Sequence, residues 1–160
     1  MKEASSGTAL HVERDVGPDA TATHIPFPFR VDQESECLEI AFSYEPKILM
    51  DDGRARELIQ TGIREYAESL ENADPEQWRV HAPVRNLLTL SLDGPLGFRG
   101  CAHRFDRVKQ IVIGRTSATP GFIPGPIEAG PWKATVSVHL VATERCTIHL
   151  EVRVAGTERQ

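Results

Sequence analysis

The sequence predicts a mainly β protein, an antiparallel two-sheet β-sandwich of the jelly-roll or galactose-binding-like kind with one inserted amphipathic helix. Large apolar residues alternate with polar ones in six or seven segments, which is the period of a half-buried strand. Turn-forming residues separate these segments. Helical periodicity occurs once only, so the chain lacks the strand–helix alternation of a parallel sheet.

Length and composition fit one globular domain spanning residues 1–160. The chain has 160 residues, of which 40% are hydrophobic and 26% charged. Residues 1–7 are small and polar, and we expect them to be disordered. The three cysteines are widely spaced, without the spacing of a zinc site, so neither a disulfide framework nor structural zinc is expected.

Charge and hydropathy argue against two classes of partner. The net charge is −5 and there is no basic run, so a nucleic acid would be repelled. No apolar run approaches the ~20 residues that a membrane-spanning helix needs.

The N-terminus has no signal-peptide pattern, which predicts a cytoplasmic protein.

Three strands are predicted in the first third of the chain. Leu10 and Val12 indicate a short edge strand. The stretch from Ile25 to Val31 alternates strictly, but its two outward prolines remove ladder donors, which places it at a sheet edge. The next strand covers Leu38–Tyr44.

A single amphipathic helix is predicted at about residues 54–71. Asp51 or Asp52 can cap its N-terminus. We expect its one apolar stripe to lie on the sheets as a lid or side cover, rather than to serve as a partner-binding face. Trp78 is expected to hold the segment that leads from the helix back to the next strand. The stripe consists of Ile59, Ile63, Tyr66 and Leu70.

The remaining strands are predicted at residues 88–92, 108–114, 132–140 and 146–154. Residues 96–107 read as a glycine-punctuated loop. Because the link Ala142–Arg145 is short, the last two strands are expected to pair as an antiparallel hairpin.

The stretch Ser117–Trp132, which we call the Pro–Gly loop, is predicted to be an ordered loop around which the other elements are arranged. Proline fixes φ and lacks a donor, while glycine permits positive φ, so neither a helix nor a regular strand can run through it. Its apolar residues argue against a free linker. We therefore expect a rigid loop that lies against a sheet and closes one end of the sandwich. Its structural positions are Pro120, Gly121, Pro124, Gly125, Pro126 and Gly130.

Two motifs in this half of the chain resemble a known pattern. Phe98-Arg99-Gly100 is followed, after a strand, by ATPGF-x-PGPI-x-x-G-x-W over residues 118–132. Together they are similar to the N-terminal β-sandwich domain of CehA/McbA-type metallohydrolases of the PHP superfamily, over roughly Phe27–Val154. The resemblance implies an accessory domain. The family's catalytic His-x-His motif is absent from this sequence, and residues 101–104 depart from the family's small residues, so no metal ligand carries over.

A binding site could form where the two motifs meet. Its candidate residues could make an anion or sugar pocket, because guanidinium groups fork onto carboxylates and phosphates. The alternative is that Arg99 satisfies loop carbonyls while Phe98 and Phe122 plug the sandwich. The candidates are Arg99, His103, Arg104, Phe122 and Trp132.

Metal binding and nucleophilic catalysis are not predicted, and no cofactor is expected. His139 and His149 could lie close across the expected hairpin, but a metal needs a third ligand, for which His81, His103, Cys101 and Asp106 are the candidates. The side chains of Cys101 and His103 are expected to diverge. No nucleophile elbow, Walker loop or dinucleotide fingerprint occurs.

The favoured function is therefore a non-catalytic accessory or interaction module. Its expected partner is a hydrolase domain, another subunit or a separate protein. The alternatives are a small-ligand or carbohydrate-binding sandwich that uses the loops at 98–104 and 117–132, and a small metal-dependent hydrolase.

Overall fold

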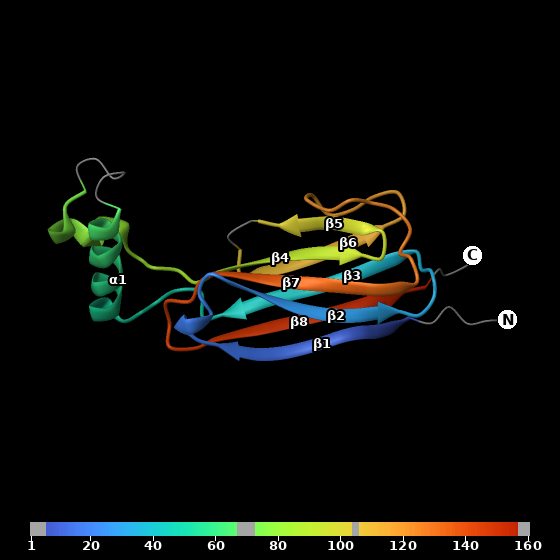
Figure 1. Cartoon of the computed structure of the whole chain (residues 1–160), viewed down its shortest axis with the longest axis horizontal. Coiled ribbons are helices and arrows are strands. Elements are labelled where there is room, and N and C mark those ends of the chain that lie inside the picture. The colour runs from blue at the N-terminus through green and yellow to red at the C-terminus, as the bar shows by residue number, and fades with distance from the viewer. Residues whose placement is uncertain (1–5, 67–72, 104–105, 157–160) are drawn as a thin grey trace.

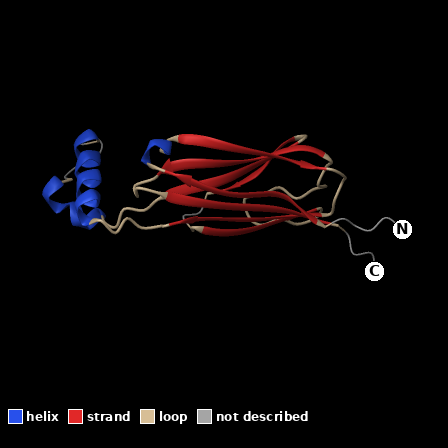
Figure 2. Cartoon of the chain, turned by 90° about the horizontal axis from the view of Figure 1, so that it is seen from below, coloured by secondary structure: helices blue, strands red, loops and turns tan. Residues whose placement is uncertain are grey.

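The protein is a β-sandwich of two four-stranded antiparallel sheets, as the sequence predicts. The computed structural model describes residues 6–66, 73–103 and 106–156. The two layers and the long axis of the molecule are seen in Figure 1, and the layers are seen from below in Figure 2.

Each sheet has two central and two edge strands. The first sheet has the order β1 (Gly7–Val16), β8 (Cys146–Ala155), β3 (Cys37–Glu45), β6 (Val108–Gly114). The second has the order β2 (Thr23–Val31), β7 (Gly130–Leu140), β4 (Leu87–Gly94), β5 (Gly97–Ala102). A short 3-10 turn, η1 (Pro18–Ala20), joins β1 to β2.

Strands β1 and β2 are edge strands, as predicted. Pro26 and Pro28 of β2 are exposed on the outer face of the second sheet. Strand β1 is longer than the short strand expected around Leu10, and it begins at Gly7, the last residue of the segment predicted to be disordered. Residues 1–5 lie outside the described part of the chain.

The predicted hairpin of the last two strands is wrong. Strand β7 pairs with β2 and β4, whereas β8 pairs with β1 and β3 in the other sheet. The short link therefore crosses between the layers, and Val141 and Ala142 are buried there. A short link is compatible with a hairpin and also with a crossing between sheets. Here each of the two strands is hydrogen-bonded on both edges by strands of its own sheet.

Strand β5 was expected to be part of a loop. It pairs with β4 through a tight turn at Gly94–Gly97, and the register shifts beside Asp93. Gly100 explains why the sequence looks irregular: its φ is +127°, and a Cβ at this position would come within 2.5 Å of the Phe122 Cα. The glycine thus lets the Pro–Gly loop approach the strand.

The inward residues of both sheets form one continuous core, in the alternating phases that the sequence predicts. Trp132 stacks on Phe29 across paired strands, with ring centroids 6.2 Å apart. Fully buried members of the core include Leu38, Ile40, Tyr44, Leu88, Leu90, Leu92, Ile113, Ile127, Ile148 and Leu150.

The helix does not cover the sheets. Helix α1 (Asp52–Glu65) and the 3-10 segment η2 (Pro75–His81) pack on each other beyond one end of the sandwich (Figures 1 and 2). Asp51 caps α1 as predicted, accepting a hydrogen bond from the Arg54 N–H at 2.9 Å. Residues 67–72, including Leu70, lie outside the described part of the chain.

We call residues 46–86 the helical arm, because both of its connections leave the same end of the sandwich. The two connecting segments pair with each other: the Leu49 N–H donates to the Val84 carbonyl (3.0 Å) and the Asn86 N–H donates to the Lys47 carbonyl (2.9 Å). Figure 1 shows this narrow connection between α1 and the sheets.

Of the predicted stripe, Ile63 is buried in the arm, whereas Tyr66 is exposed. The apolar stripe therefore identified neither the element that buries it nor all of the residues that are buried.

Candidate functional site

The Pro–Gly loop is ordered and lies against both sheets. Strands β5 and β6 are edge strands of different sheets, and the loop bonds to each of them. On β5 the Cys101 N–H donates to the Gly121 carbonyl at 3.0 Å, and on β6 the Thr119 N–H donates to the Val112 carbonyl at 2.9 Å. The loop therefore covers part of the gap between the two sheets along this side.

Arg99 holds the loop from inside. Its side chain is only 9% exposed, and the guanidinium donates to the carbonyls of Ile123 (3.2 Å) and Pro126 (2.9 Å). It also pairs with Glu128 at 3.1 Å and lies over the Trp132 ring. Loop oxygens surround the guanidinium, which favours the structural alternative for this residue.

The other predicted binding residues that the structure describes do not form an open pocket with Arg99. Trp132 is 2% exposed in the core, and its indole N–H donates to the Glu128 carbonyl at 2.9 Å. Phe122 is also buried, whereas Phe98, the second expected plug, is more than half exposed. His103 is exposed on the surface, and Arg104 lies outside the described residues.

Cys101 and His103 meet, contrary to the expectation that their side chains diverge. The Cys101 Sγ and the His103 Nε2 are 2.6 Å apart. Residues two positions apart along a strand point to the same face of a sheet, so the expectation was wrong in its geometry. Both residues border a cleft of about 470 Å³ between β5, β6 and the Pro–Gly loop.

The histidines considered as metal ligands are separated by the fold. His139 is on the outer face of the second sheet, where its Nε2 lies 2.9 Å from the Thr89 Oγ1. His149 is on the first sheet, with Glu13 and Glu45 within 3.8 Å of its ring nitrogens. Within residues 6–66, 73–103 and 106–156, no three His, Cys, Asp or Glu side chains are arranged to hold a metal ion.

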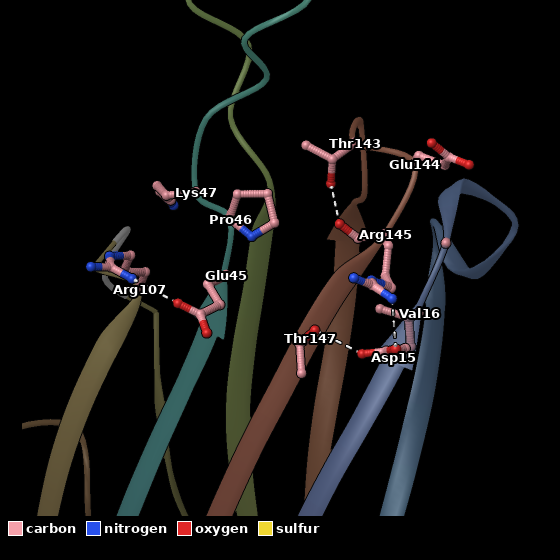
Figure 3. Close-up of a pocket in the computed structure, with 11 residues that line it drawn as sticks. Asp15, Val16, Glu45, Pro46, Lys47, Arg107, Thr143, Glu144, Arg145 and Thr147 are labelled. Carbon is pink, nitrogen blue, oxygen red and sulfur yellow. Dashed lines mark hydrogen bonds and ion pairs between the residues drawn. The ribbon is translucent and has the colours of Figure 1, made fainter.

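A polar hollow of about 1230 Å³ lies at the base of the helical arm (Figure 3). Its charged groups pair loosely: Arg107 is 3.7 Å from Glu45, and Arg145 is 3.7 Å from Asp15. Lys47 comes from the arm itself. The sequence does not reveal this hollow, because its walls come from strands β1, β3 and β8 and from connections far apart in the chain.

The helical arm exposes several large apolar side chains that were not predicted to be exposed. Met50 is 84% exposed, Val80 is 73% exposed, and Ile48 and Tyr66 are also exposed. The buried residues of α1 and η2 are Ala55, Ile63 and Trp78, and none belongs to the main core. The available signal was the apolar residues Ile48, Met50 and Val80, which lie outside the helical stripe that periodicity identified.

No protein-family model matches the chain, and no curated protein matches it at a significant level. Across the described residues, no helix has both the length and the apolar character required to cross a membrane.

Proposed function

We propose that this protein is a non-catalytic interaction module that uses its helical arm to dock on a separate hydrolase domain. The observation that carries the proposal is the position of the arm, which stands beyond the sandwich and exposes apolar side chains there. A partner that covered Met50 and Val80 would remove apolar surface from water, which is the main driving force of protein association.

The small interior of the arm supports this proposal. A helix of the 14 residues of α1 is marginally stable by itself, and helices in proteins depend on packing. Ala55, Ile63 and Trp78 are the only residues of α1 and η2 that are buried. A partner surface would therefore stabilise the arm as well as bind it.

The proposed identity of the partner rests on the sequence resemblance. The Phe98-Arg99-Gly100 and ATPGF-x-PGPI motifs are similar to those of a domain that accompanies a metallohydrolase. The described residues hold no metal-binding cluster of their own. A hydrolase domain of the CehA/McbA type is therefore the partner to test first.

The test mixes this protein with a purified CehA/McbA-type hydrolase domain from the same genome and measures the complex mass by light scattering. We expect a one-to-one complex that is lost in Val80→Asp and Met50→Asp. Leu96→Asp is the matched control, because Leu96 is equally exposed, on the turn between β4 and β5 at the opposite end of the sandwich.

Three outcomes would contradict the proposal. They are the absence of a complex, a complex that Leu96→Asp disrupts as strongly as Val80→Asp, and a homodimer held together by the arm in the protein alone. The last result would make the partner a second copy of this chain.

The hollow at the base of the arm favours a second candidate, the binding of a small polar ligand such as a sugar acid. Lys47, Arg107 and Arg145 line it together with carboxylates and threonine hydroxyls (Figure 3). A ligand that binds the native state raises the melting temperature. We expect such a rise with sugar acids, and expect Arg145→Ala to abolish it. A flat response across sugars, carboxylates and phosphates would exclude this candidate.

A further inference from the structure

The three cysteines of the chain occupy different environments. Cys146 is fully buried in the core, and burial raises the pKa of its thiol to about 11. Cys37, at the start of β3, is partly exposed, and burial together with the nearby Glu39 raises the pKa of its thiol. Cys101 alone has a histidine nitrogen within hydrogen-bonding distance of its sulfur.

The surroundings of Cys101 are partly open to solvent. The residue lies on the edge strand β5, and its neighbour across the ladder is Ser91, which is uncharged. Its side chain is partly exposed, and His103 is exposed beside it. The cleft of about 470 Å³ that both residues border could admit a small molecule.

We propose that Cys101 is a thiol-exchange site that forms a mixed disulfide with small-molecule disulfides, with His103 as the proton acceptor. The arrangement has the features of reactive cysteines, which are partly exposed and lie beside a group that takes up the thiol proton. Cys37 and Cys146 lack such a partner among the described contacts.

The exchange balances without a further oxidant. The His103 imidazole accepts the proton of the Cys101 thiol, and the thiolate attacks one sulfur of the disulfide RS–SR. The Cys101–SR bond forms as the RS–SR bond breaks. The departing RS⁻ takes the proton back from the imidazolium and leaves as RSH. The Cys101 sulfur is oxidised and the departing sulfur is reduced.

The experiment treats the folded full chain at neutral pH with dithiobis(nitrobenzoate), and in parallel with glutathione disulfide, and assigns the modified cysteine by peptide mass spectrometry. We expect Cys101 to be modified roughly tenfold faster than Cys37, while Cys146 stays unmodified in the folded protein. Cys37 is the internal control, because it is partly exposed but has no histidine partner.

The variant His103→Gln separates activation from access. At neutral pH we expect its Cys101 to react about tenfold more slowly than in the unaltered protein. At a pH of about 10, where an accessible thiol ionises without help, we expect the two rates to converge. The other titratable groups of the described cleft residues, Asp106 and Lys109, are present in both proteins.

Two results would overturn the proposal. One is equal modification of Cys37 and Cys101 at neutral pH. The other is a His103→Gln protein that reacts as fast as the unaltered one, or more slowly by the same factor at every pH. Unchanged circular dichroism of His103→Gln confirms that the comparison is made between folded proteins.

Discussion

The sandwich and the helical arm differ in how they are stabilised. In the sandwich, every strand contributes to one core, and Leu38, Leu88 and Ile148 are completely buried in it. In the arm, α1 and η2 pack mainly on each other, and their three buried residues lie outside that core. The sandwich therefore has a large interior of its own, whereas the arm has a small interior and exposes Met50 and Val80.

Each region buries one tryptophan. Replacing these two residues should give the largest difference in unfolding free energy between the regions. We expect Trp132→Ala to lower the free energy of unfolding by about 3–5 kcal/mol, because it empties the centre of the core and removes the ring that Arg99 covers. Trp78→Ala should disorder the arm and leave the main unfolding transition of the sandwich almost unchanged. Urea titration followed by near-ultraviolet circular dichroism measures both. Equal losses would show that the arm and the sandwich form one cooperative unit.

The Pro–Gly loop should also contribute to the stability of the sandwich, through Arg99. Arg99→Met should destabilise the protein by about 2–3 kcal/mol, because the loop carbonyls and Glu128 lose a charged donor in a nearly buried place. Thermal unfolding measures the loss. Arg115→Met is the control: its ion pairs with Glu34 and Glu36 are exposed, so we expect little change. A neutral Arg99→Met would show that the loop does not depend on this residue.

Asn86 is the residue that joins the two regions. It is fully buried; its side chain donates to the Pro46 carbonyl and the Thr143 hydroxyl and accepts from the Ala142 N–H at 2.7 Å. Asn86→Ala leaves these groups without a partner, and we expect a loss of about 2 kcal/mol. Hydrogen exchange should also rise in the link between β7 and β8. Increased exchange restricted to the arm would contradict this role.

Cys146 predicts a smaller, pH-dependent effect that belongs to the sandwich alone. In the fold its thiol keeps the proton until about pH 11, whereas in the unfolded chain it ionises near pH 8.5. Above that value the unfolded state binds fewer protons, so stability falls as pH rises from about 9 to about 11, by roughly 1–2 kcal/mol. Subtracting the stability curve of Cys146→Ala isolates this contribution. A difference that does not vary with pH over this range would contradict it.

Strand periodicity predicted the sandwich, because a strand that is buried on one face alternates apolar and polar residues along its length. The phases of Phe27, Leu90 and Val136 all follow from alternation. The same logic failed for β5, where Gly97 and Gly100 adopt positive φ and interrupt the pattern. It also failed for the pairing of β7 and β8, because a short link is compatible with either a hairpin or a crossing between sheets.

The candidate site was harder to predict, because its parts come together only in three dimensions. Arginine in a motif suggested a ligand, but the carbonyls that Arg99 binds belong to its own loop, and sequence cannot distinguish the two. The contact between Cys101 and His103 was predictable from their spacing, because residues two positions apart in an extended segment point to the same side. The projection of the arm was not, because an amphipathic stripe does not reveal its partner.

Hydrogen exchange of the protein alone tests the difference between the two regions most directly. We expect the amides of α1 to exchange through local openings of low free energy, while those of the central strands β3, β4, β7 and β8 exchange only on global unfolding. Protection of α1 equal to that of the central strands would contradict the account, because it would show that the arm is stabilised without a partner.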